Sequence, residues 1–102
     1  MSNVYSGHVN ANDGFSSPVA FDGPTGWTVF KAQQTEIYKI THNLHLTNPA
    51  KQLHVVVMPE TINVGVTISQ SADVFTLTTL RHTNNAAVAT PFTFIAVHYP
   101  TV

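Results

Sequence analysis

The sequence contains no cysteine, and this absence excludes several kinds of site at once. Without thiols the chain has no disulfide bond, no cysteine nucleophile and no thiolate zinc site. Its 102 residues are enough for one compact domain and too few for two. We therefore expect a single domain over residues 1–102 that is stabilised by packing alone.

Charged residues are also scarce. Only 9% of the residues are charged, and four Lys or Arg against five Asp or Glu give a net charge of −1. With so few Lys and Arg residues, the protein cannot form the strongly basic surface that binds a phosphate backbone. We therefore expect no nucleic-acid partner. Because 43% of the residues are apolar, solubility must depend on hydroxyl and amide groups, including those of 14 threonines, or on surface hidden in an oligomer.

Long hydrophobic runs are missing as well. The apolar run at residues 55–58 is far shorter than the roughly 20 residues of a membrane-spanning helix, so we expect no membrane insertion. The first residues carry neither a basic nor an apolar region, and we therefore expect no secretory signal. A cytoplasmic protein, a non-classically secreted protein and a virion component all stay open.

What the sequence does contain is a repeated alternation of apolar and polar residues, which is typical of half-buried strands. The alternation is clearest at residues 62–69, where the even-numbered positions are apolar and would share one buried face. Similar patterns predict strands at residues 37–46, 53–57 and 75–77, separated by turn-forming residues. Together with shorter strands near both ends of the chain, they predict an all-β fold, an antiparallel β-sandwich of roughly six to eight strands.

The last predicted strand, residues 91–99, is apolar on both faces. Its apolar residues divide between the faces, with Phe92, Phe94 and Ala96 on one and Ile95, Val97 and Tyr99 on the other. Val56 and Met58 give an earlier strand the same property. Since a sandwich core covers only one face, we predict a homo-oligomer in which a second copy covers the other. The alternative is a strand at the centre of a wrapped barrel.

Motifs for catalysis and metal binding are absent from the sequence. It has no Gly-x-Ser-x-Gly, no phosphate-binding loop and no His-x-His pair that would share a strand face. In the predicted strand at residues 37–46, His42 and His45 would point to opposite faces and could not chelate one ion together. We therefore expect no enzymatic activity, no cofactor and no metal site. A metal site assembled across strands or at an oligomer axis stays open as the alternative.

Two polar loops are the best candidates for function. Asp22 precedes Gly-Pro-Thr-Gly, and residues 81–85 read Arg-His-Thr-Asn-Asn. Carboxylate, amide, imidazole and guanidinium groups of this kind pair with the hydroxyls of sugars. Alternatively, the first loop is an Asx-type turn and the second is an ordinary hairpin turn.

The order of these elements resembles the H-type lectin domain, the small all-β lectin of snail agglutinins and of the C-terminal part of amoebal discoidins. The resemblance covers most of the chain. It includes residues 4–9 with their Ser-Gly pair, the proline-containing segment 44–49, the apolar strand 53–58, residues 73–77, and the Phe-Thr-Phe-Ile-Ala of residues 92–96. The last of these segments is the most characteristic.

This resemblance implies an antiparallel sandwich that assembles as a homotrimer or hexamer and binds galactose or N-acetylgalactosamine in shallow sites near protomer interfaces. Asp22, Gly26 and His82 match the sugar contacts of that family, and Arg81 and Asn84 are further candidates in the loop that holds His82. Arg81 stands where the family has an aromatic residue, so the sugar itself is left open. The competing function is a structural or receptor-binding component of a phage tail fibre or a similar particle, without enzymatic activity.

Overall fold

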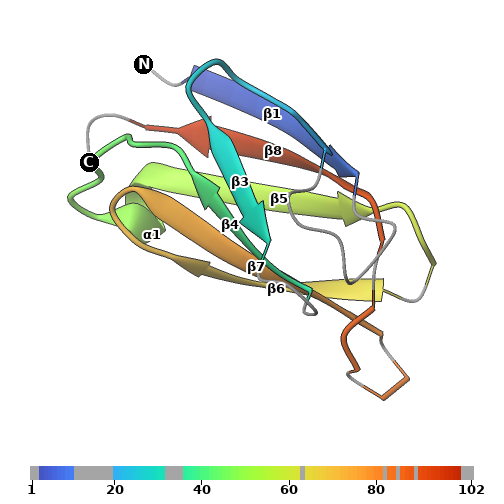
Figure 1. Cartoon of the computed structure of the whole chain (residues 1–102). Helices are drawn as coiled ribbons and strands as arrows, with labels where there is room; N and C mark the ends of the chain where they lie inside the picture. The colour runs from blue at the N-terminus through green and yellow to red at the C-terminus, as the bar shows by residue number, and fades with distance from the viewer. Residues whose placement is uncertain are drawn as a thin grey trace.

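In the computed structural model the chain forms two β-sheets (Figure 1). The structure describes residues 3–10, 20–31, 36–62, 64–81, 83–84, 86–88 and 90–99. These residues contain eight strands and one short helix: β1 (Asn3–Asn10), β2 (Ala20–Asp22), β3 (Thr28–Lys31), β4 (Ile37–Thr41), α1 (Pro49–Gln52), β5 (Leu53–Pro59), β6 (Val64–Gln70), β7 (Val74–Arg81) and β8 (Phe92–His98).

Each sheet has four strands, and all neighbouring strands are antiparallel. Sheet A has the order β2-β1-β8-β5, and sheet B has the order β3-β4-β7-β6. The chain passes from sheet A to sheet B between β2 and β3, through the turn that follows Asp22. The predicted all-β class and antiparallel pairing are confirmed.

The core lies between the two sheets and is filled by one side of each strand. In β8, Phe92, Phe94 and Ala96 are fully buried, as the alternation of its residues predicts. Tyr38 of β4 meets Phe92 edge-on, with 5.1 Å between the ring centroids. Trp27 stacks on Phe94 at 5.8 Å. These contacts fill the space between sheet A and sheet B. The outer face of each sheet is therefore the surface that a ligand can reach.

The prediction of one strand over residues 37–46 is wrong for its second half. β4 ends at Thr41, and the backbone then enters the left-handed region at Asn43 and His45, with φ values of 57° and 53°. A residue in that conformation cannot continue a strand, so His42 and His45 do not occupy opposite faces of one. His42 and Leu46 are nevertheless buried as expected, and Leu44 is partly buried against the core.

The burial expected at residues 62–69 is also wrong at both ends. Ile62 lies before β6 and is 84% exposed, and Ile68 within β6 is 38% exposed. The reason is that β6 forms an edge of sheet B and pairs only with β7, so fewer neighbouring side chains cover its inner face. Alternation predicts which residues share a face, but not whether a strand is central or at an edge.

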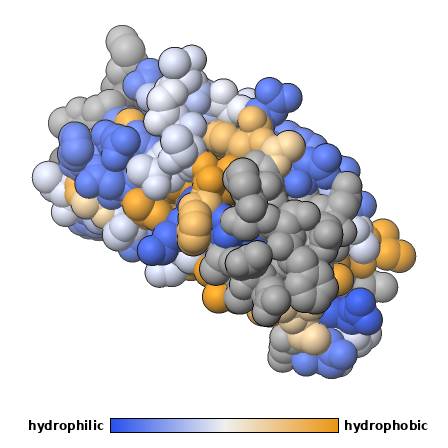
Figure 2. Space-filling model, in the orientation of Figure 1, coloured by the Kyte–Doolittle hydropathy of each residue, from blue (hydrophilic) through white to orange (hydrophobic). Residues whose placement is uncertain are grey.

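The outer face of sheet A carries a group of exposed apolar residues. Five large apolar side chains there are exposed to solvent: Val4, Val56, Met58, Ile95 and Tyr99. The pairing of β5 with β8 places Val56 beside Ile95, so these residues adjoin one another. Hydrophobic residues also reach the surface among hydrophilic ones in the view of Figure 2. A single chain leaves this face in water, and the homo-oligomer stays a prediction.

Candidate functional site

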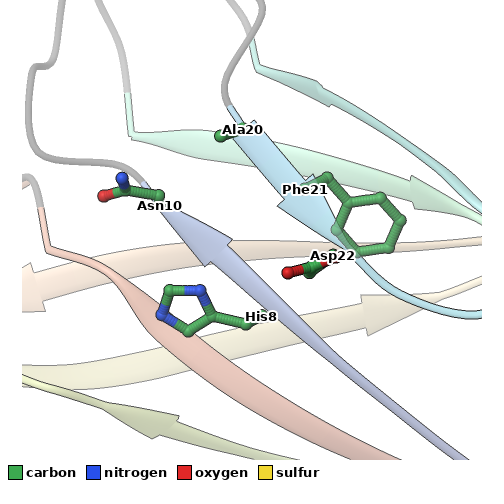
Figure 3. A pocket seen from close by; sticks show the side chains of 5 residues that line it. All are labelled: His8, Asn10, Ala20, Phe21 and Asp22. Atoms are coloured by element: carbon green, nitrogen blue, oxygen red, sulfur yellow. The ribbon is translucent and has the colours of Figure 1, made fainter.

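A pocket lies at the β2 edge of sheet A, on its outer face (Figure 3). It has a volume of about 230 Å3 and is lined by His8, Asn10, Ala20, Phe21 and Asp22. Strand register brings these residues together, because His8 of β1 pairs with Asp22 of β2 and Asn10 pairs with Ala20. Val9 points into the core, so its neighbours His8 and Asn10 point outward, and their partners in β2 do the same.

The polar groups that line the pocket come from two adjacent strands, and a carboxylate from the segment after β5 contacts one of them. The His8 Nε2 atom lies 2.6 Å from Oε2 of Glu60, and both side chains are about half exposed. The Glu60 amide donates to the carbonyl oxygen of Pro91 at 2.9 Å, and this hydrogen bond holds Glu60 next to the start of β8. In Figure 3 the Asp22 carboxylate and the His8 imidazole lie on the same side of the β1–β2 pair. Carboxylate, imidazole and amide groups therefore converge on one open site.

The fixed charge of this region is negative. All four basic side chains of the protein lie elsewhere in the described structure: Lys31 in β3, Lys39 in β4, Lys51 in α1 and Arg81 at the end of β7. Asp22 lines the pocket, and Glu60 contacts its His8. A region with carboxylates and no lysine or arginine repels acidic ligands and suits neutral ones that are rich in hydroxyl groups.

The turn after β2 holds Asp22 in place. Phe21 points into the core and stacks on Phe94 with 6.2 Å between the ring centroids. A Cβ atom at Gly23 would overlap the Phe21 ring, so a larger residue there would displace it. Gly26 has a φ of 87°, in the left-handed region that favours glycine. Of the two residues predicted in this loop, Asp22 therefore lines the pocket, whereas Gly26 shapes the backbone of the turn between the sheets.

The other predicted site residues lie away from this pocket. Arg81 ends β7 in sheet B, opposite Val64. Asn84 lies in the segment between β7 and β8. Its Oδ1 atom accepts a hydrogen bond from the Ala86 amide at 3.1 Å, as in an ordinary polar turn. His82 lies outside the described residues. A single chain thus brings neither Arg81 nor Asn84 to the pocket that contains Asp22.

Two polar residues of the pocket, His8 and Asn10, were not predicted as site residues from the sequence. His8 is far from the other histidines in the sequence, and Asn10 begins a segment that reads as a turn. The alternation at residues 4–9 places His8 on the face opposite Val9, but no local pattern pairs it with Asp22. That pairing depends on the register of β1 and β2.

The described residues contain neither a metal-binding cluster nor a membrane-spanning helix. Within these ranges, no group of three or more His, Cys, Asp or Glu residues is arranged to hold a metal ion. In the same residues, no helix has the length and apolar character needed to span a membrane.

In comparisons with models of protein families, with curated proteins and with solved structures, the chain has no significant match. The resemblance to H-type lectins therefore stays a prediction from the sequence, and function must be argued from the residues of the site.

Proposed function

We propose that this protein binds carbohydrate, without enzymatic activity, and that the pocket at His8, Asn10 and Asp22 takes one sugar unit of the galactose type. The observation that supports this most directly is that Asp22, a candidate from the sequence, lines a pocket together with an imidazole and an amide. Carboxylate oxygens accept hydrogen bonds from sugar hydroxyls, while amide and imidazole groups both donate and accept them. Neighbouring hydroxyls of one sugar ring match groups that converge from two strands.

The negative charge around the pocket favours neutral sugars over acidic ones. With Asp22 in the pocket and Glu60 beside it, a uronic acid or a sialic acid would place its own carboxylate among like charges. A neutral sugar has no such penalty. The proposal is therefore for neutral sugars such as galactose and N-acetylgalactosamine, with acidic sugars bound more weakly.

Assembly is the second part of the proposal. An open pocket on a strand pair binds a single sugar weakly, with a Kd of roughly 1 mM, or about −4 kcal/mol. Several pockets on a homotrimer or hexamer would raise the apparent affinity for a glycan-coated surface without any new contact. The exposed apolar residues of sheet A, such as Val56 and Ile95, support assembly because contiguous apolar surface is uncommon on a monomer.

The pocket is tested by following backbone amide signals by NMR while galactose, N-acetylgalactosamine or galacturonic acid is added. We expect the two neutral sugars to shift amides of β1 and β2, and we expect galacturonic acid to bind more weakly. Asp22→Ala removes a charged acceptor, and we expect it to weaken binding about tenfold or more.

Arg81→Ala is the matched control, because Arg81 was also a candidate and lies outside the pocket. We expect it to leave affinity unchanged. If Arg81→Ala abolishes binding while Asp22→Ala does not, the site is the loop after β7 and the pocket is the wrong choice. If no sugar binds to the wild-type protein at any concentration tested, carbohydrate binding itself is rejected.

Assembly is measured separately, by light scattering of the purified protein. We expect a particle of three or six copies of the 11.1 kDa chain. A monomer at all concentrations would remove the multivalent part of the proposal and would leave the pocket to be judged by the NMR titration.

A further inference from the structure

Every backbone amide of the 42–46 loop, which follows β4, is hydrogen-bonded. Four of the five donate to the turn before β7: His42 and Asn43 to the carbonyl oxygen of Asp73 at 2.8 and 3.2 Å, His45 to Oδ1 of Asp73 at 3.0 Å, and Leu46 to the carbonyl oxygen of Ala72 at 2.8 Å. The His45 ring adds a further contact, with Nδ1 lying 2.7 Å from the same Asp73 oxygen. The loop is therefore joined to the β6–β7 turn by non-local hydrogen bonds, and its backbone is left-handed at Asn43 and His45.

The fifth amide, that of Leu44, donates to the Nδ1 atom of His42 at 3.1 Å. An Nδ1 atom that accepts a hydrogen bond carries no proton, so the neutral ring carries its proton on Nε2. Nε2 is buried and, in the described structure, has no hydrogen-bond partner. The ring lies against Trp27 and Phe75, with centroid distances of 5.6 and 6.3 Å, and His42 is only 4% exposed. This arrangement fits the neutral form of His42 and no other.

Among the described residues, three titratable groups act on His42 through their charge: Asp73, His98 and His45. Burial lowers the pKa of His42 below its ordinary value of 6.5, and this is the largest effect. Asp73 in the β6–β7 turn opposes it, because a carboxylate favours the protonated ring. His98 of β8 and His45 of the loop act in the same direction as burial. At a given pH below 6.5, His42 is therefore protonated less often in the closed loop than in the open one.

We propose that protonation of His42 opens the 42–46 loop, so that this end of the sandwich is released under mildly acidic conditions. A proton taken from solvent by Nδ1 removes the acceptor of the Leu44 amide and leaves two donors facing each other. It also places a positive charge among aromatic rings, where Nε2 has no hydrogen-bond partner among the described residues. When the loop leaves Asp73, the charged ring reaches water and both costs disappear.

The size of the effect follows from proton linkage. Well above pH 6.5, the ordinary pKa of the ring, His42 is neutral whether the loop is open or closed, and it adds no pH dependence to opening. Below pH 6.5 the exposed ring binds a proton that the buried ring does not. The open form is then favoured by up to about tenfold for each further pH unit, until the pH reaches the lower pKa of the closed form.

Hydrogen exchange of backbone amides, followed by NMR between pH 5 and pH 8, tests this proposal. After correction for intrinsic exchange rates, we expect the protection of the Asn43, His45 and Leu46 amides to fall by up to about tenfold per pH unit below 6.5. Protection of the Leu77 amide, in the centre of β7, should stay constant over the same range. Equal pH dependence at Leu77 would mean global unfolding and would overturn the proposal.

Two variants separate His42 from the other groups that titrate nearby. In His42→Asn the side-chain oxygen can still accept from the Leu44 amide but does not titrate, so we expect the pH dependence to disappear. His54→Asn changes an exposed histidine on β5 and should leave the pH dependence intact. If His42→Asn opens with the same pH dependence as the wild type, Asp73 or another group is responsible and the proposal is wrong.

A measurement on the wild-type chain covers the case in which His42→Asn does not fold. The ring nitrogen signals of His42 report its protonation directly, and they should show the proton on Nε2 at neutral pH. Protonation of the ring must then coincide with loss of protection in the 42–46 loop. A ring that becomes charged while the Leu44 amide keeps its hydrogen bond overturns the proposal.

Discussion

Replacing Lys31 by methionine tests how the fold holds an ion pair in its core. The Nζ atom of Lys31 lies 3.5 Å from Oε2 of Glu36, and the two side chains are 0% and 6% exposed. The Tyr38 hydroxyl donates to the other carboxylate oxygen of Glu36. Burial, followed by the hydrogen bond to Glu36 and its charge, raises the pKa of Tyr38 above its ordinary value of 10.0. The three side chains thus form one buried polar cluster. Each of its two charges, on Lys31 and Glu36, is stabilised in the core by the opposite charge.

The loss expected from Lys31→Met is large because it leaves the Glu36 carboxylate buried without its cation. Removing one partner of a buried pair costs about 3–5 kcal/mol of the free energy of unfolding. For a domain of this size, that loss lowers the Tm by roughly 12 °C or more. Adding Glu36→Gln removes the unpaired charge and keeps an oxygen for the Tyr38 hydroxyl. We therefore expect the double variant to lie within about 2 kcal/mol of the wild type.

Urea unfolding followed by circular dichroism, applied to the wild type, both single variants and the double variant, measures the coupling between the two charges. If the double variant loses as much stability as the two single variants added together, the charges do not interact. The reasoning from the buried ion pair would then be refuted.

Three further substitutions test the packing and the backbone, all by urea unfolding. Gly7→Ala places a Cβ atom 2.7 Å from the ring of the fully buried Phe94, and we expect a loss of about 1–3 kcal/mol; a neutral result would show that the ring can move. At Gly26 a Cβ atom meets nothing within 4 Å, so Gly26→Ala should cost only the backbone strain of its positive φ, about 1–2 kcal/mol. Thr79→Val removes the hydrogen bond from Oγ1 to the Val88 carbonyl oxygen, which is 2.7 Å long, and should cost about 1 kcal/mol. A gain in stability for that variant would argue against this hydrogen bond.

The sequence by itself determined the class of fold and much of the core. An apolar residue at every second position can be buried all at once only in a strand that turns one face inward, so alternation predicted β5, β7 and β8 before any contact was known. The same pattern showed that β8 has apolar residues on both faces. Asp22 was a candidate because its carboxylate stands in a polar loop that can pair with sugar hydroxyls, and because the resemblance to H-type lectins implies a sugar contact there. These features depend on residues close together in the chain.

Only the tertiary structure decided where β4 ends, which charges are buried and which residues share the pocket. β4 ends at Thr41 because the following amides bind Asp73, which is about 30 residues away in the sequence. His8 joins Asp22 because β1 and β2 pair in one register, and a shift of one residue would have turned His8 to the other face. Alternation repeats every two residues and specifies faces, whereas register, edges and buried ion pairs depend on contacts between distant segments.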